Sequence, residues 1–265
     1  MTEIVPHNRL YHYCKLSTAI EYILSNRQLK LSPLINTNDP RENKSFVFGV
    51  RYWEWEGFGF NNDINTLNEY VSTQIRSDCK VICFSICGVL DGYQLSQMWA
   101  HYGDMHKGVC IEIDYEEFVK ENVAYINTGN FKCIEYVNPK SYTDKIVTDR
   151  YKQIDFTSKN CTEEFINYIR KRFRIEHKDY LYFTKSVEWE HEQEFRLLHF
   201  SNENSNEFCS IKKSLKGIYL GVDFNSKYLP SILTLLEGET VPVWQLNYSG
   251  EWIYCHANLN TLETN

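Results

Sequence analysis

The hydrophobic and polar positions along the chain form short blocks that predict strands with helices between them. Runs rich in β-branched and aromatic residues between turn formers indicate strands. The expected strands cover residues 9–16, a short stretch from residue 29, and residues 80–89, 107–115, 131–137, 194–200, 217–224 and 241–249. Helical spacing predicts helices over residues 17–28, 93–104 and 116–123, before Arg76, and over most of 144–180. This order predicts an α+β fold with much antiparallel pairing.

Four glutamates occupy alternate positions where the strand over 194–200 is expected to begin. Glu188, Glu190, Glu192 and Glu194 lie in "VEWEHEQEF" and would point to one face of an extended segment. Like charges this close repel one another, so the pattern indicates either a solvated edge or a site that needs a carboxylate. Glu194 begins the apolar strand, and we expect it to be the partly buried member.

Length and composition predict one folded domain over residues 1–265, with a mostly helical insertion around residues 140–180. Hydrophobic residues make up 43% of the chain and charged residues 24%, which is enough for an apolar core. The net charge of −7 argues against broad binding to nucleic acid or anionic lipid. A basic stretch, "RKRFRIEHK" at residues 170–178, has its charges spread around a helix, which favours a solvated helix over a phosphate track.

The cysteines and the N-terminus indicate a reduced, cytoplasmic protein that does not enter a membrane. Nine cysteines are scattered without a CxxC pair, so we expect no zinc site and no other metal. "MTEIVPHNRL" lacks an apolar signal region, and no window reaches eighteen apolar residues. The phosphate-binding loop, the nucleophile elbow, the HExxH motif and the EF-hand loop are also missing from the sequence.

An ordered set of motifs resembles a bacterial family known only as a domain of unknown function. The motifs are "LSPLINTNDPRE", "CFSICG", "MWAHYGDMHKGVCIEID" and "KSVEWEHEQEFRLL", and the resemblance spans roughly residues 10 to 220. Some members of that family are linked to abortive infection against phage. The resemblance therefore implies a role in bacterial defence.

The opening segment "LYHYCKLSTAIEYILSNRQLKLSP" is similar to the diphtheria-toxin and poly-ADP-ribose polymerase branch of the ADP-ribosyltransferases. In that branch a strand bearing histidine precedes a helix and a second strand, and a glutamate opens a late strand. The resemblance implies an ADP-ribosyltransferase-like split antiparallel β-sheet core with flanking helices, and NAD as substrate. Tyr13 stands where the family has glycine.

The resemblance implies four catalytic residues. Cleavage of the nicotinamide–ribose bond passes through a cation-like sugar, which a nearby carboxylate stabilises. Glu194 would accept from the ribose and offset this charge, His12 would orient the ribose, Ser85 would support Glu194 by a hydrogen bond, and Glu192 would position an acceptor. Alternatively, His12 is a core or edge histidine, and Glu194 pairs with Arg196 or Lys185 as a surface ion pair.

Further residues are expected to bind NAD, with Phe84 as the best candidate to stack on nicotinamide. The expected NAD-binding residues are Tyr11, Tyr13, Ser32, Asn38, Asp39, Phe84, Trp99 and Tyr102. For Trp99 and Tyr102 the alternative is core packing, and for Asn38 and Asp39 it is the shaping of a turn.

Three functions compete at this point. The first is an NAD-consuming ADP-ribosyltransferase or NAD glycohydrolase with a macromolecular acceptor, either protein or nucleic acid, and with an antitoxin or phage trigger as possible partners. For this enzyme, Glu194→Gln is expected to abolish NAD turnover and to leave the melting temperature nearly unchanged. The second is an inactive nucleotide- or RNA-binding sensor of a defence system. The third is a metal-dependent nuclease, which only the four glutamates suggest.

Overall fold

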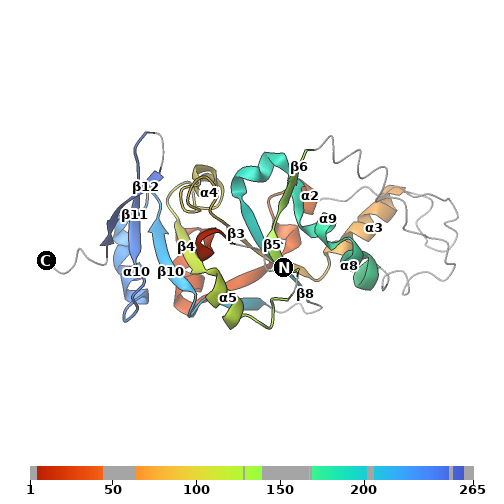
Figure 1. The fold of residues 1–265 in the computed structure, drawn as a ribbon, viewed down its shortest axis with the longest axis horizontal. Helices are drawn as coiled ribbons and strands as arrows, with labels where there is room; N and C mark the ends of the chain where they lie inside the picture. Colours follow the sequence, from red (N-terminus) through yellow and green to blue (C-terminus); the bar gives the residue numbers. More distant parts are fainter. Residues whose placement is uncertain are drawn as a thin grey trace.

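The computed structural model describes residues 5–43, 64–127, 129–138, 167, 169–201, 206–250 and 253–259 (Figure 1). Within these residues, ten strands form one large sheet in which β10 and β11 pair in parallel and the other paired strands are antiparallel. Eight of them lie in the order β12 (Ile253–Asn258), β11 (Val243–Tyr248), β10 (Leu215–Leu220), β4 (Val109–Asp114), β1 (Arg9–Cys14), β3 (Cys79–Ser85), β2 (Gln28–Pro33) and β9 (Glu207–Ser210). β8 (Glu194–Phe200) pairs with β3 and with β5 (Phe131–Cys133). The prediction of a mixed fold with much antiparallel pairing is confirmed.

A second, small sheet stands apart from the large one. β6 (Glu135–Val137) and β7 (Thr184–Ser186) pair in parallel. The sequence predicts one strand over residues 131–137, but the chain leaves the large sheet at Ile134, so that β5 and β6 belong to different sheets. The backbone amide of Ile134 still donates to the carbonyl of Glu194 at 2.9 Å, which holds this crossing point beside β8.

Helices flank the large sheet and gather at one end of the molecule (Figure 1). The helices near the sheet are α1 (Leu16–Thr18) with η2 (Ala19–Leu24), α4 (Ser96–His101), α5 (Tyr115–Glu121), and η8 (Ser226–Tyr228) with α10 (Leu229–Leu235). At the end away from β12 lie α3 (Ile64–Arg76), η6 (Ile169–Phe173), α8 (Arg174–Glu176) and α9 (Lys178–Tyr182). Short helical turns complete the described chain: η1 (Pro6–Asn8), η3 (Leu34–Asn36), α2 (Pro40–Asn43) and η7 (Val187–Glu192). Of the helical insertion expected around 140–180, residues 169–182 are helical apart from the turn at His177, and residues 139–166 lie outside the described part.

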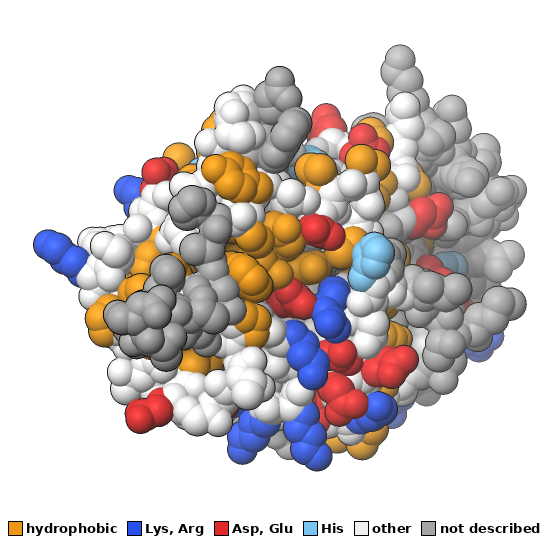
Figure 2. Space-filling view, turned by 60° about the vertical axis from the view of Figure 1, so that its left-hand side comes forward, with side chains coloured by type: hydrophobic (Ala, Val, Ile, Leu, Met, Phe, Trp, Pro, Cys, Tyr) orange, Lys and Arg blue, Asp and Glu red, His pale blue; other side chains and the backbone are white. Residues whose placement is uncertain are grey.

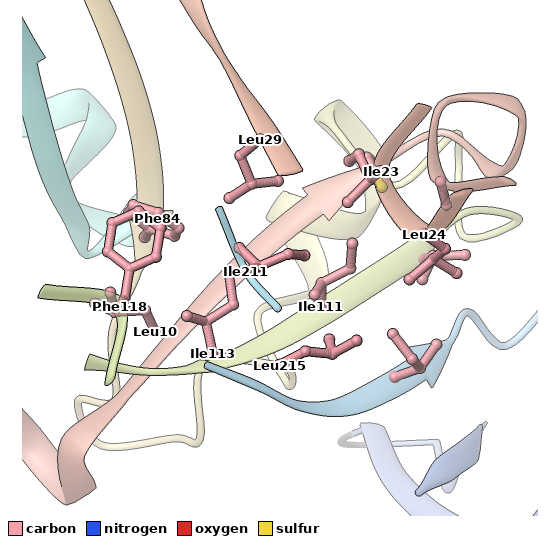
Figure 3. Packing of buried hydrophobic residues seen from close by; sticks show 14 of the residues in the cluster. Leu10, Ile23, Leu24, Leu29, Phe84, Ile111, Ile113, Phe118, Ile211 and Leu215 are labelled. Atoms are coloured by element: carbon pink, nitrogen blue, oxygen red, sulfur yellow. The ribbon is translucent and has the colours of Figure 1, made fainter. Parts of the chain in front are cut away.

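One face of the large sheet is covered by a continuous apolar core. Ile111 and Phe84 from the sheet pack there with Leu24 of η2, Phe118 of α5 and Ile232 of α10. Figure 3 shows part of this cluster, with leucine and isoleucine side chains from several strands packed together. The alternation of inward and outward residues along each strand directs these side chains to one face.

The opposite face carries two separate apolar clusters. Trp99 and Met98 of α4 pack in one of them with Tyr11 and Tyr13 of β1. The other joins α3, α9, β3 and β8, and its members are Leu34, Val71, Ile75, Cys79, Val81, Ile134, Phe173, Leu181, Tyr182, Phe183 and Leu198. Polar and charged side chains therefore have a place between two apolar regions on this face.

The edge of β3 that faces β1 and β2 is shared between them. At one end Ser85 pairs with Tyr11 of β1, and toward the other end Val81 pairs with Ser32 of β2. Between these points the described chain supplies no strand partner on this edge. The large sheet therefore opens between β1 and β2 along this edge of β3.

Candidate functional site

A cavity of about 200 Å³ lies at this opening of the sheet. It is bordered by β1, β2, β3 and the turn after β2, by α4 and the residue that follows it, and by β7, η7 and the first residue of β8. Its lining includes all four expected catalytic residues, His12, Ser85, Glu192 and Glu194. The topology thus brings together residues that are up to 182 positions apart in the chain.

His12 fills part of the gap between the strands. Its Nδ1 lies 3.0 Å from the carbonyl oxygen of Cys83, in the part of β3 that has no strand partner on this edge. A carbonyl only accepts, so Nδ1 carries the proton and donates. Burial lowers the pKa of His12, so the ring is neutral at pH 7. The remaining nitrogen, Nε2, is then an acceptor without a proton.

Ser85 lies directly opposite Glu194 in the ladder between β3 and β8. Both side chains are buried, and both residues line the cavity. The expected hydrogen bond between them is not formed, because Ser85 Oγ has no hydrogen-bond partner among the described residues. A buried hydroxyl without a partner has lost its hydrogen bonds to water, and this desolvation costs free energy. A ligand that forms a hydrogen bond to the hydroxyl would offset this cost.

Glu194 is held by two cations. Its Oε1 lies 2.6 Å from Arg196 Nε, and its Oε2 lies 3.1 Å from Arg196 Nη2 and 2.6 Å from Lys185 Nζ. Burial alone would raise the pKa of Glu194, but Arg196 and Lys185 lower it to about 2. The carboxylate is therefore ionised at neutral pH. The pairing with Arg196 and Lys185 foreseen from the sequence is present, but it is buried and not on the surface.

Glu192 belongs to the same network but not to the strand. Its Oε1 accepts from Tyr102 Oη at 2.7 Å, and its Oε2 lies 2.7 Å from Lys185 Nζ. Tyr102 follows α4 directly, so this hydrogen bond joins the helix to η7 across the cavity wall.

The structure corrects the expectation that the four glutamates share one face of a strand. Residues 187–192 form the 3-10 helix η7, which begins where Ser186 Oγ accepts from the amide of Glu188. Glu188 and Glu190 are exposed there, whereas Glu192 is buried. Gln193 then takes a left-handed conformation with φ 46°, and β8 begins at Glu194. Helical periodicity and this left-handed residue replace the alternation that would have placed all four carboxylates together.

Arg196 supports the network from behind the cavity. It is fully buried, and its Nη1 lies 2.5 Å from Glu42 Oε1 and 2.8 Å from the carbonyl oxygen of Tyr182. The network therefore contains two cations, Lys185 and Arg196, and three carboxylates. At the cavity itself, Glu192 and Glu194 face the single buried ammonium of Lys185, while Lys30 is an exposed member of the lining.

The expected NAD-binding residues divide into three groups. Ser32, Asn38 and Tyr102 line the cavity and are not fully buried, although Tyr102 also packs against the apolar cluster that contains Trp99. Tyr11, Tyr13 and Phe84 also line it, but they are buried members of apolar clusters. The Phe84 ring packs edge-on against Phe118 at 5.3 Å and against His12 at 6.0 Å between centroids.

Trp99 and Asp39 do not line the cavity. Trp99 is fully buried, packs edge-on against Tyr13 at 5.0 Å and donates from Nε1 to the carbonyl of Tyr93. Asp39 is buried beside the start of α2, where its carbonyl accepts from the amide of Glu42. Trp99 thus follows the alternative of core packing, and Asp39 that of shaping the chain before α2.

Two residues near Glu194 were not among the expected site residues. Lys185 lines the cavity and binds both of its carboxylates. Tyr136 on β6 accepts a hydrogen bond from the backbone amide of Glu194 at 2.9 Å. The sequence offered Lys185 only as an alternative ion-pair partner of Glu194, on the strength of its place just before the glutamate-rich stretch. Nothing in the pattern around Tyr136 distinguishes it from a packing tyrosine.

Two arginines of the basic stretch at 170–178 bind groups of the protein itself. Arg172 pairs with Glu176 at 2.8 Å, and Arg174 is buried with its guanidinium on the carbonyls of Arg170 and Ser77. On the face shown in Figure 2, lysine and arginine side chains lie interspersed with acidic ones beside a central group of hydrophobic side chains. These arrangements do not favour a continuous track for nucleic-acid phosphates.

Two searches of the described residues bear on metals and membranes. Among them, histidine, cysteine and acidic side chains form no group of three or more that could hold a metal ion. None of the helices in this part of the chain has the length and apolar character needed to cross a bilayer.

Comparison with known proteins gives one match. Residues 98–197 match the family described as protein of unknown function (DUF2971). This is a shorter stretch than the one over which the sequence motifs suggested such a family. It contains Tyr102, Lys185, Glu192 and Glu194 but neither His12 nor Ser85. No curated protein and no solved structure matches the chain.

Proposed function

We propose that this protein consumes NAD, as an ADP-ribosyltransferase or an NAD glycohydrolase, with the nicotinamide–ribose end bound in the cavity at the split of the sheet. The observation that carries the proposal is that residues from three strands line the same cavity. His12 from β1, Ser85 from β3 and Glu194 from β8 line one cavity, although they are far apart in the chain. These are the residue types that the resemblance to ADP-ribosyltransferases requires at one place.

The size of the cavity supports a bound fragment and not a whole dinucleotide. Pockets that enclose drug-sized ligands measure roughly 300–1,000 Å³, and this one measures about 200 Å³. The nicotinamide and the adjoining sugar would occupy it, and the rest of NAD would extend outside.

The charge of the cavity lining also supports the binding and cleavage of NAD. The nicotinamide ring of NAD is cationic, and the sugar becomes cationic as the bond to nicotinamide breaks. Two carboxylates, Glu192 and Glu194, face the cavity with one ammonium between them. Glu194 is buried and ionised at neutral pH, and a fixed negative charge that is shielded from water stabilises a developing positive one most strongly. Neutral His12 supplies an acceptor for a ribose hydroxyl through Nε2.

The experiment is to incubate the purified protein with NAD and to measure nicotinamide release by chromatography. The wild type is expected to release nicotinamide, and Glu194→Gln and His12→Ala are expected to lose at least 100-fold of this rate. The matched control is Lys80→Met, which removes a partly buried Lys–Glu pair, Lys80 with Glu207, at residues that do not line the cavity. A wild-type protein that neither binds nor consumes NAD, with or without lysate of phage-infected cells, contradicts the proposal.

One observation favours a second candidate, an inactive binding module for a nucleotide or RNA. Arg196 and Lys185 engage both oxygens of Glu194, which uses most of the four or so acceptor positions of a carboxylate. A binding module is expected to show saturable NAD or nucleotide binding by calorimetry without nicotinamide release. Binding with turnover supports the enzyme instead.

The proposed setting is bacterial conflict, either phage defence or toxicity, as the resemblance to defence-linked families implies. A macromolecular acceptor, a phage trigger and a restraining antitoxin are the partners that such an activity needs. Expression of the wild type is expected to lower cellular NAD and arrest growth, and Glu194→Gln is expected to do neither.

A further inference from the structure

The small sheet places two side chains next to Glu194. Tyr136 of β6 and Lys185 of β7 are direct partners in the parallel ladder, so they project to the same side of it. Lys185 Nζ lies 2.6 Å from Glu194 Oε2, and Tyr136 Oη lies 2.9 Å from the backbone nitrogen of Glu194. One ladder position of the small sheet thus contacts both the carboxylate and the backbone of the first residue of β8.

Lys185 and Arg196 bind Glu194 in different ways. Arg196 lies on the same strand as Glu194, does not line the cavity, and is anchored on Glu42 and on the backbone of Tyr182. Lys185 lines the cavity and also binds Glu192 at 2.7 Å. The ammonium is therefore the cation that holds both cavity carboxylates at the surface a ligand would meet.

The groups around Glu194 come from several elements. Arg196 lies on β8, Lys185 on β7, Cys83 on β3 and Tyr136 on β6. Two further carboxylates bind the same cations. Glu192 on η7 binds Lys185, and Glu42 on α2 binds Arg196. Without Lys185, Glu194 would keep Arg196 as its ion-pair partner, and Glu192 would keep its hydrogen bond from Tyr102. Burial disfavours the charged form of a carboxyl group, so Glu194 would then take up a proton more easily.

We propose that Lys185 and Tyr136 are positioning residues, which fix the charge and the direction of the Glu194 carboxylate at the cavity. Tyr136 fixes the backbone where β8 begins, and Lys185 fixes the side chain. The small sheet, which lies outside the large one, thereby governs the group on which the proposed reaction depends. The consequence for turnover rests on the proposed function, whereas the effect on Glu194 itself does not.

The test is a carbon-13 NMR titration of protein labelled at glutamate side-chain carboxyl carbons, with the Glu194 signal assigned by its loss in Glu194→Gln. In Lys185→Met the titration midpoint of Glu194 is expected to rise by one pH unit or more. Lys185→Arg is expected to restore it, and Lys80→Met is expected to leave it unchanged. An unchanged midpoint in folded Lys185→Met overturns the proposal.

Tyr136→Phe tests the backbone contact and also serves if Lys185→Met does not fold. Removal of one hydroxyl takes away the acceptor of the Glu194 amide, so hydrogen exchange of this amide is expected to rise more than ten-fold. Equal exchange in the variant and the wild type overturns the proposed role of Tyr136.

The same variants connect the inference to turnover without depending on it. If the protein consumes NAD, Lys185→Met is expected to lower kcat more than it changes KM, and Lys185→Arg is expected to recover part of kcat. If the wild type consumes no NAD, the proposed function fails, while the titration and the exchange measurement still decide the role of the pair.

Discussion

Glu194 and Arg196 lie two residues apart on β8 and form a bidentate ion pair that is almost completely shielded from water. Arg196 Nε donates to Glu194 Oε1 at 2.6 Å, and Arg196 Nη2 donates to Glu194 Oε2 at 3.1 Å. The Arg196 side chain is 0% exposed and the Glu194 side chain is 3% exposed. Residues two apart on a strand share a face, so the strand itself places the guanidinium beside the carboxylate. This pair connects the stability of the fold to the chemistry proposed for the cavity.

Glu194→Gln is expected to cost stability as well as turnover. The amide keeps the shape of the side chain but loses charge-assisted hydrogen bonds to Arg196 and Lys185, which are worth roughly 1.5–3 kcal/mol each for charged groups. Glu42 and Glu192 still balance the two cations, so we expect a net loss of about 2 kcal/mol in the free energy of unfolding. Urea denaturation measures this loss. A melting temperature equal to that of the wild type, as the sequence alone suggested, would contradict the burial of the network.

Arg196→Met is expected to be the more damaging change. It removes the guanidinium that Glu42 and Glu194 share, and removal of one partner from a buried pair costs about 3–5 kcal/mol. The measurement is urea denaturation of the two variants side by side, with Lys120→Met as control because Lys120 forms an exposed pair with Glu117. Equal stability of Arg196→Met and the control would show that the network contributes little.

The stability of the protein is expected to fall as the pH drops below 4.5. The pKa of Glu194 is about 2 in the folded protein and about 4.5 in the unfolded chain, so between these values only the unfolded chain binds the proton. Glu194 therefore contributes stability above pH 4.5, and about 3 kcal/mol is lost as the pH falls toward 2. Urea midpoints measured from pH 6 to pH 3 should fall less steeply in Glu194→Gln. Parallel curves for variant and wild type would refute this linkage.

Ser85→Ala is expected to leave the free protein as stable as the wild type or up to about 1 kcal/mol more stable. Ser85 Oγ is buried without a partner among the described residues, so its removal takes away an unsatisfied group. Binding of NAD, measured by calorimetry, is expected to weaken about ten-fold if the ligand bonds to this hydroxyl. A large loss of stability in Ser85→Ala would instead indicate a structural role.

The order of most elements was predictable from local pattern, whereas the site residues followed from the family resemblance. The apolar runs at β1, β3, β4 and β8 are strong signals because their inward residues form the main core. The resemblance to ADP-ribosyltransferases singled out His12, Ser85 and Glu194, and the structure places all three on one cavity. The strands β9 and β12 were not predicted, because they are short or polar and gain their structure by pairing with β2 and β11.

Other parts of the site depend on tertiary contacts that no local pattern encodes. The stretch at 187–192 alternates like a strand, but the ion pair of Lys185 with Glu192 and the left-handed Gln193 belong to a helical turn. Tyr136 reaches Glu194 only because the chain leaves the large sheet at Ile134. Short segments of this kind take their structure from what surrounds them.

The most direct test of the central claim is an NMR titration of Glu194→Gln with NAD, since this variant is expected to bind NAD without consuming it. With histidine side chains and backbone amides labelled, NAD is expected to shift the ring signals of His12 and the amides of Ser85 and residue 194. Signals around the control pair of Lys80 and Glu207 should move far less. If saturating NAD leaves the His12 ring and the Ser85 amide unchanged, the cavity does not hold the nicotinamide–ribose end and the account is wrong.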